Sequence, residues 1–325
     1  MAPTTLQITR RADLLPEAEL AALQPILDDI ERLKRQRNAV VAAHNYMTPD
    51  IYGAAADLTG DSLALAAMAK ETEADVIVLA GVHFMAETAK IVNPTKTVLI
   101  PDERAGCSLA EGITGDDVRR LKAKYPGVPV VTYVNTTAEV KAETDICCTS
   151  GNAVAVVESL GVDRVIFLPD QYLGRYVASQ TDVEVILWDG ACMVHERFTG
   201  REIRNHKARL PGVSVIAHPE CPPDVLAEAD YVGSTNGIIR WVEDNQPEQV
   251  MMITECSMAD NVALENPGVE FVRPCNLCPH MKRITLDNIK RSLETMTYEV
   301  DVAPDVAGRA RRAVERMLEV GRRED

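Results

Sequence analysis

The stretch GACMVHERFTGREI (190–203) carries a pattern that occurs three times in this chain. Its cysteine, Cys192, is followed seven places later by a threonine and eleven places later by a β-branched residue. Cys107 lies 85 residues before Cys192, Cys278 lies 86 residues after it, and both are followed by the same residue types at the same intervals. Self-similarity at a fixed period predicts repeated structural units, so we expect the three thiols to occupy equivalent places. The residues that follow the cysteines are Thr114 and Val118, Thr199 and Ile203, and Thr285 and Ile289. We expect the three threonines to cap the helices that follow.

The composition argues against several classes of partner. A chain of 325 residues suggests two or three domains. Its net charge of −15 argues against nucleic acids and anionic membranes, whose binding needs a basic surface. Small anions can still be held by backbone N–H groups. No apolar run approaches the roughly 20 residues that span a membrane, and the polar start Met1–Arg11 predicts no signal peptide. We therefore expect a soluble, cytoplasmic protein.

Short apolar segments alternate with helical ones along the repeat. The first strand of each unit is expected at 39–43, 128–132 and 213–217, and polar triplets follow: His44-Asn45-Tyr46, Tyr133-Val134-Asn135 and His218-Pro219-Glu220. Two further strands per unit are expected at 75–80 and 97–100, 164–168 and 183–188, and 249–254 and 269–272. Strands that alternate with helices indicate parallel sheets. We predict an α/β protein with three homologous α/β/α domains, whose short parallel sheets surround a pseudo-threefold axis.

The predicted domains are 1–112, 113–197 and 198–285, with helices in 286–325 packing back on the first domain. The charged end of the chain, from Arg309, is expected to be a solvated helix face. Ligands of open α/β sheets gather beyond the carboxyl ends of the strands, so the cysteine loops and the polar triplets should converge on one central cavity. Hydroxyl residues that recur with the repeat are expected to cap helices whose N-termini can hold anions. They are Ser62, Ser150 and Thr235.

Three converging thiolates would supply three soft metal ligands and leave room for a fourth that the protein does not provide. Taken singly, a cysteine is equally well explained as a small buried hydrophobic residue. Cys275 and Cys278 form a CxxC, which could be half of a zinc site, but no second half-site of suitable spacing exists. We expect Cys275 to stand beside the shared site or to form a redox-sensitive pair with Cys278. The remaining cysteines are expected to pack in the interior without disulfides: Cys147, Cys148, Cys221 and Cys256.

A series of longer motifs runs in order along nearly the whole chain. They are AHNYM (43–47), GDSLALA (60–66), FMAETAKI (84–91), AGCSLAEG (105–112), TYVNTTAEVKAETD (132–145), CTSGNA (148–153), PDQYLGRYV (169–177), GACMVHERF (190–198), AHPEC (217–221), GSTNGI (233–238) and CPHMKR (278–283). In this order they resemble quinolinate synthase, the A protein of NAD biosynthesis. The resemblance implies three α/β domains and one [4Fe–4S] cluster held by Cys107, Cys192 and Cys278. It also implies a substrate pocket formed by His44, Ser62, Tyr133, Val134, Asn135, Ser150, His218, Pro219, Glu220 and Thr235.

The resemblance implies a condensing enzyme that joins iminosuccinate and dihydroxyacetone phosphate to make quinolinate, with release of phosphate and water. A cluster with three protein ligands leaves one iron open, and that iron can act as a Lewis acid. We predict proton transfer by Tyr46 and Glu220, because ring closure needs enolisation, imine formation and dehydration. Glu220 would need a raised pKa to act as an acid near neutrality. His44 and His195 complete the expected catalytic group; whether His195 contacts substrate or supports the cluster ligand stays open.

Two rival functions share part of this pattern. A cluster-dependent hydro-lyase acting on another small dicarboxylate would use the same site but not the same ordered motifs. A non-catalytic iron–sulfur sensor or carrier would need a partner-binding module or an exposed cluster, and the sequence shows no basic reading element. We also expect a functional link to an aspartate oxidase or dehydrogenase that produces iminosuccinate. Arg175 and Lys282 are interpreted as solvated or structural rather than as anion clamps.

Overall fold

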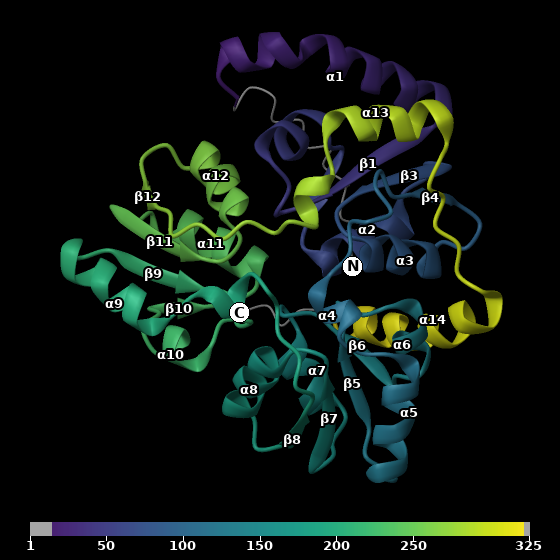
Figure 1. The fold of residues 1–325 in the computed structure, drawn as a ribbon, viewed down its shortest axis with the longest axis vertical. Coiled ribbons are helices and arrows are strands. Elements are labelled where there is room, and N and C mark those ends of the chain that lie inside the picture. Colours follow the sequence, from purple (N-terminus) through teal and green to yellow (C-terminus); the bar gives the residue numbers. More distant parts are fainter. Residues whose placement is uncertain (1–14, 322–325) are drawn as a thin grey trace.

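The structure is a computed structural model that describes residues 15–321. It contains three four-stranded parallel sheets flanked by helices, which confirms the predicted fold class. Counted within its own unit, each sheet has the strand order second, first, third, fourth. The three sheets surround a common centre (Figure 1). The polar start Met1–Arg11 lies outside the described residues.

The first sheet belongs to residues before Cys107. Its central strand β3 (Val76–Ala80) reads VIVLA and is buried along its whole length, as expected for a parallel strand that helices cover on both faces. Asp61 caps the following helix α2 with its side chain, which accepts the N–H of Ala64 at 2.9 Å. The elements are β1 (Ala39–His44), π-helix η2 (Asp50–Ala55), β2 (Leu58–Gly60), α2 (Ser62–Glu71), β3, α3 (His83–Val92), β4 (Thr97–Leu99) and α4 (Ser108–Glu111).

The second sheet repeats this plan between Cys107 and Cys192. Thr114 starts it as predicted: its side chain caps α5 in a capping box with Asp117. The central strand β7 (Arg164–Leu168) has the predicted bounds, and only its first residue is exposed. The elements are α5 (Gly115–Lys124), β5 (Val130–Tyr133), α6 (Ala138–Ala142), β6 (Ile146–Cys148), α7 (Ala153–Ser159), β7, α8 (Gln171–Gln180), β8 (Glu184–Leu187) and 3₁₀-helix η3 (His195–Arg197).

The third sheet lies between Cys192 and Cys278. Thr199 caps its first helix by accepting the N–H of Glu202 at 3.3 Å, and Thr285 caps the helix that follows the unit, both as predicted. The elements are α9 (Gly200–Arg209), β9 (Ser214–Ala217), α10 (Pro223–Leu226), β10 (Tyr231–Val232), α11 (Thr235–Asn245), β11 (Gln249–Ile253), α12 (Cys256–Glu265), β12 (Glu270–Val272) and 3₁₀-helix η4 (Met281–Arg283).

All nine predicted strands are present, but each sheet also has a fourth strand that the sequence pattern did not predict. These are the edge strands β2, β6 and β10, which have three, three and two residues. Segments this short contain too few residues to show a hydrophobic period. The strands of each sheet fall within one predicted domain range, while the boundaries at 112 and 197 stay predictions.

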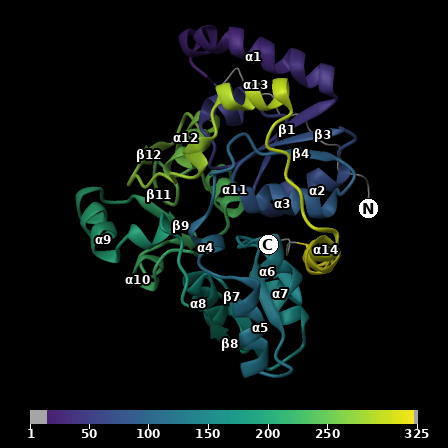
Figure 2. The same cartoon turned by 45° about the vertical axis from the view of Figure 1, so that its right-hand side comes forward.

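Three further helices frame the units. α13 (Leu286–Thr295) lies against α1 (Glu17–Arg37), whereas α14 (Pro304–Val320) packs against α3 of the first unit and α6 and β6 of the second (Figure 2). The tail therefore bridges two units. Its charged face is not simply solvated, because Arg309 pairs with Glu143 at 2.6 Å and Arg316 donates to the carbonyl of Asp145 at 2.7 Å.

The apolar core divides unevenly among the units. One cluster of buried side chains runs through the first unit, one face of the second sheet, α13 and α14. The second sheet has a separate cluster on its other face, and the third sheet has a separate cluster on each face. Polar contacts tie the third unit to the first. The Asn261 amide donates to the carbonyls of Asn45 and Met47 at 3.0 and 2.8 Å, and the Asn45 amide donates to Thr235 Oγ1 at 2.9 Å. These contacts fix the polar turn that follows β1.

Candidate active site

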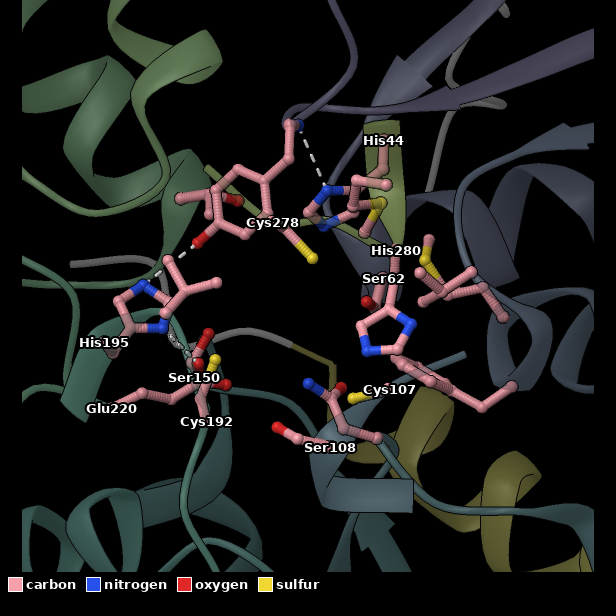
Figure 3. A pocket seen from close by; sticks show the side chains of 18 of the residues that line it. His44, Ser62, Cys107, Ser108, Ser150, Cys192, His195, Glu220, Cys278 and His280 are labelled. Carbon is pink, nitrogen blue, oxygen red and sulfur yellow. Dashed lines mark hydrogen bonds and ion pairs between the residues drawn. The ribbon is translucent and has the colours of Figure 1, made fainter. Parts of the chain in front are cut away.

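A cavity lies at the centre, where the carboxyl ends of strands from all three units meet. The space open to the centres of water molecules in this cavity is about 70 Å³. All three repeat cysteines line it, and their sulfur atoms surround one space in Figure 3. Of the other predicted site residues, the following also line it: His44, Tyr46, Ser62, Tyr133, Asn135, Ser150, His195, His218, Glu220 and Thr235. The predicted convergence on one cavity is therefore present in the structure.

Two of the predicted site residues do not line this cavity. Val134 lines a smaller adjoining pocket behind Ser62, and Pro219 is absent from the cavity lining. Successive side chains of an extended segment point to opposite faces, so Val134 and Pro219 face away from the side to which their flanking residues point.

Each cysteine sits in the same local structure. The three loops follow β4, β8 and β12, and a short helical turn begins directly after or near the cysteine. The backbone N–H groups two and three residues later donate to the sulfur: Leu109 and Ala110 for Cys107, Val194 and His195 for Cys192, and His280 and Met281 for Cys278. The repeat therefore supplies three sulfur sites with matching donors.

Burial works against these N–H groups. It raises the pKa of Cys107 to about 12, raises that of Cys192 well above its usual range, and also raises that of Cys278. A desolvated thiol becomes a thiolate when a cation lies beside it. The three sites together therefore have the chemistry of ligands for a positively charged metal group.

A second, more compact donor set lies next to Cys192. In the described part of the chain, Cys192, His195 and Glu220 form the one group whose ligand atoms all lie within 4.8 Å of one another. His195 Nδ1 and Glu220 Oε2 are 2.6 Å apart, a hydrogen-bonding distance. The three cysteines do not form such a compact group, so their arrangement suits a larger metal group better than a single ion.

The polar turns after β1 and β9 have the same backbone geometry. The N–H of Tyr46 donates to His44 Nδ1 at 3.1 Å, and the N–H of Glu220 donates to His218 Nδ1 at 3.4 Å. With Nδ1 as acceptor, each ring carries its proton on Nε2. His218 Nε2 lies 3.1 Å from Ser150 Oγ, so it donates to that hydroxyl. Burial lowers the pKa of His44 to about 4 and that of His218 to about 3, so both rings are neutral at pH 7.

A chain of contacts joins these turns across the cavity wall. His195 pairs with Glu220 through Nδ1, and its Nε2 lies 3.0 Å from Thr254 Oγ1. The same threonine oxygen lies 2.7 Å from the Tyr46 hydroxyl. His195 is thus buried between the carboxylate of one turn and the phenol of the other.

The pKa values of Tyr46 and Glu220, the two ends of this series of contacts, are shifted in opposite directions. Burial and the nearby Glu220 carboxylate raise the pKa of Tyr46 well above its usual range. Burial alone would raise the pKa of Glu220, but His195, His218 and a hydrogen bond from Tyr133 outweigh it and lower the value to about 2. Glu220 is therefore a carboxylate at neutral pH. The raised pKa that an acid role would require is not found.

The recurring hydroxyls are not the helix caps that we predicted. Asp61 caps α2 and Ser234 caps α11, so Ser62 and Thr235 are the first helical residues after the cap. Ser150 lies two residues before Asn152, the residue that precedes α7. Because neighbouring residues hold the cap positions, the hydroxyls of Ser62, Ser150 and Thr235 are available to the cavity that they line.

Sequence reasoning missed several residues at the site. His280 lines the cavity and projects into it in Figure 3, and Thr254 holds the contacts described above. Two buried carboxylates support the cysteine loops: Asp170 accepts the N–H of Cys192 and Glu255 accepts that of Cys278, both at 3.2 Å. The last two are 85 residues apart, so the repeat interval itself could have identified them.

One prediction about the cysteines is wrong. Cys256 and Cys275 form a disulfide in the structure, with their Cα atoms 5.1 Å apart. Cys275 therefore does not pair with Cys278, and it is not among the residues that line the cavity. Cys256 is not a simple packing residue. The CxxC spacing favoured Cys278 as partner, whereas the fold brings the start of α12 next to the Cys278 loop. Cys147, Cys148 and Cys221 are free and buried, as predicted.

Comparison with known proteins identifies the family of the chain. Residues 28–319 match the family described as "Quinolinate synthetase A protein". The chain belongs to this family. Similar proteins include quinolinate synthase 2 of Mesorhizobium japonicum, which is 65% identical over 94% of this chain and 95% of the relative. The quinolinate synthase of Agrobacterium fabrum is 61% identical over 96% and 90%, and that of Caulobacter vibrioides is 57% identical over 91% and 82%.

The family match extends over all three units, from within α1 to the end of α14. Membership in the quinolinate synthetase A family therefore applies to the whole arrangement of three sheets around one cavity. Across residues 15–321, no helix is both long and apolar enough to cross a membrane.

Proposed function

We propose that this chain is a quinolinate synthase of NAD biosynthesis. It condenses iminosuccinate with dihydroxyacetone phosphate to form quinolinate and releases phosphate and water. One observation carries the proposal: in a member of this family, three equivalent cysteines and the polar strand ends of three units line a single cavity. The curated relatives named above are quinolinate synthases that match the chain over nearly their full length.

The family implies an iron–sulfur cofactor, and the residues present fit one. Cys107, Cys192 and Cys278 would hold a [4Fe–4S] cluster, since each is a half-buried cysteine whose sulfur has two backbone N–H donors. Such a cluster supplies a Lewis-acidic iron when it is bound through three protein ligands. No fourth cysteine lines the cavity in the described part of the chain.

The cavity can hold two small anions without an arginine cluster. The hydroxyls of Ser62, Ser150 and Thr235 come from three different units and face one space. Ser62 and Thr235 also begin helices α2 and α11, whose free N–H groups favour carboxylate or phosphate. We assign the substrate carboxylates and the phosphate to these positions, with His44, Tyr133, Asn135 and His218 as further substrate contacts. Val134 and Pro219 would act through the backbone geometry of their triplets.

Proton transfer is assigned to Tyr46 and Glu220. Glu220 is ionised and accepts a proton as the general base, while Tyr46 keeps its proton and acts as the donor. His195 contacts both through Glu220 Oε2 and Thr254 Oγ1, which fixes its ring and makes it the proton relay between them. Glu220 and His195 are buried and Tyr46 is half-buried, which restricts access of bulk water to the reacting groups.

Replacing each repeat cysteine separately tests the assignment. Cys107→Ala, Cys192→Ala and Cys278→Ala should each lose iron, sulfide and quinolinate formation when purified without oxygen, whereas Cys147→Ala, at a free and buried cysteine, should keep all three. Wild-type protein with four irons and four sulfides that forms no quinolinate would refute the synthase and favour the hydro-lyase. Iron without sulfide would favour a single ion at Cys192, His195 and Glu220.

Two wider predictions accompany the proposal. A cytoplasmic location suits an oxygen-sensitive cluster, because reducing compartments preserve thiolate ligands. The reaction also requires a supply of iminosuccinate, so we propose a functional link to an aspartate oxidase or dehydrogenase that forms it.

A further inference from the structure

The third cysteine loop has a support that combines a buried carboxylate with a lysine. Glu255 is the residue before α12, and its side chain is fully buried. Oε2 accepts the N–H of Ser257 at 2.8 Å, and Oε1 accepts the N–H of Cys278 at 3.2 Å. Lys282 Nζ lies 3.2 Å from the same Oε1. A charged acceptor makes a stronger hydrogen bond than a neutral one, so the Cys278 backbone is held firmly.

The lysine also reaches the catalytic turn of another unit. Lys282 Nζ donates to the backbone carbonyl of Tyr46 at 2.7 Å. The lysine belongs to η4, four residues after Cys278, and Tyr46 follows β1. One ammonium group therefore bonds both to the support of the Cys278 loop and to the backbone of Tyr46. Lys282 is therefore a structural cation, one of the two roles interpreted for it from the sequence.

The other two units lack this combination. At the position of Glu255, the second unit has Asp170, which accepts the N–H of Cys192 at 3.2 Å, and the first unit has Val82, which makes no side-chain cap. Four residues after the cysteine, where the third unit has Lys282, the first two units have Glu111 and Glu196. The link between a cysteine loop and a catalytic turn is thus specific to the third unit.

We propose that Glu255 and Lys282 are positioning residues that hold the Cys278 loop and the Tyr46 turn in one fixed geometry. The proposal rests on the assignment of Cys278 as a cluster ligand and of Tyr46 as the proton donor. The pair would set the approach of the phenol to the metal-bound side of the cavity. Loss of the pair would loosen the iron ligand and misplace the proton donor together.

Lys282→Met tests both effects, because it removes the ammonium group and keeps most of the apolar stem. Substitutions behind metal ligands typically weaken binding or activity 10- to 100-fold. We expect a chelator to remove iron from the substrate-free variant about 10-fold faster than from the wild type, and kcat to fall about 10-fold, with little change in KM for either substrate. Lys282→Arg should restore both, since a guanidinium can still pair with Glu255. Glu196→Gln, the exposed equivalent position, is the matched control and should match the wild type.

A second variant separates positioning from general destabilisation. Glu255→Gln should also speed iron release, and the double variant with Lys282→Met should be less affected than the product of the two single effects predicts, because the two residues act as a unit. The unfolding midpoint of each apoprotein shows whether the fold itself has weakened. Iron release and kcat equal to the wild type in both single variants would overturn the proposal. So would effects that multiply independently.

The measurements also distinguish this proposal from the assigned activity. If the wild type made no quinolinate but Lys282→Met still released iron faster, the synthase would be refuted and the loop-positioning role would stand. If quinolinate formed normally and iron release did not respond to either variant, the positioning role would fail alone.

Discussion

The turns after β1 and β9 are two copies of one structure with opposite chemistry. In both, the N–H of the third residue donates to the Nδ1 of a neutral histidine. The first copy then presents the Tyr46 phenol, and the other presents the Glu220 carboxylate. The surroundings raise the pKa of Tyr46 and lower that of Glu220. Pairs of groups whose pKa values are pushed apart mark an acid and a base.

The comparison shows how a repeat can acquire catalysis. The common backbone places two side chains at equivalent points, and the residue types then decide their roles. His195 lies between the two turns in the sequence and Thr254 lies after the second. Together they connect the Tyr46 and Glu220 side chains. The repeated backbone therefore places the catalytic side chains, while the different residue types in the copies decide their chemical roles.

Of the changes to these two turns, removal of the charge at Glu220 should have the largest effect on kcat. Glu220→Gln keeps the size of the side chain but loses the base, so kcat should fall about 10³-fold. Iron and sulfide content should stay at wild-type levels, because the three cysteines are the assigned ligands and the glutamine oxygen can still accept a hydrogen bond from His195 Nδ1. Glu228→Gln, in a surface ion pair with Arg204, is the control. Undiminished turnover in Glu220→Gln, measured as quinolinate formed without oxygen, would remove this residue from the mechanism.

Removing the phenol at Tyr46 should have the next largest effect. Tyr46→Phe loses the proton donor but keeps the ring, so we expect kcat to fall about 10²-fold. Replacing Tyr125, which follows α5, by Phe should leave kcat unchanged. The pKa directions add a second check: with Glu220 ionised above about pH 2 and Tyr46 protonated beyond pH 10, neither group should cause a fall in kcat between pH 6 and 9. A fall whose apparent pKa moves in Tyr46→Phe would contradict this assignment.

Protonation of the two turn histidines at low pH should have the smallest effect, and we measure it as a loss of stability. Their folded pKa values of about 4 and 3 lie below the ordinary 6.5, so the unfolded chain binds protons first as the pH falls. The free energy of unfolding should therefore be unaffected above pH 6.5 and decrease from there downward, by about 2 kcal/mol per histidine at pH 5. Urea unfolding of the apoprotein at pH 7.5 and pH 5 measures this loss. His218→Gln should reduce it by about half; an unchanged loss would show that His218 titrates normally.

Much of the fold was predictable because the repeat is explicit in the residues. The interval of 85 and 86 residues located the three cysteines and the threonine caps, and apolar segments that recur every 85 to 89 residues located nine of the strands. The edge strands β2, β6 and β10 could not be predicted, since pairing with β1, β5 and β9 defines them more than their own two or three residues do.

The site was predictable in its membership but not in its electrostatics. Positions after strands indicated which side chains would face the cavity, and family resemblance agreed. The low pKa of Glu220 depends on His195, which the chain brings next to it from 25 residues away in sequence. The disulfide between Cys256 and Cys275 likewise follows from the packing of α12 against the Cys278 loop. Such contacts depend on the three-dimensional arrangement and leave no local pattern.

The cysteine loops lie at connections between segments of the chain, so loss of a group bound to them would loosen several connections of the fold. Each thiol stands seven residues before a threonine that caps a helix, so the Cys107 and Cys192 loops are joints between successive units and the Cys278 loop joins the third unit to α13. A group bound to all three thiols would clamp three joints at once. Oxidative loss of that group would release them in a single event, and limited proteolysis should then cut near all three loops together instead of eroding one end of the chain.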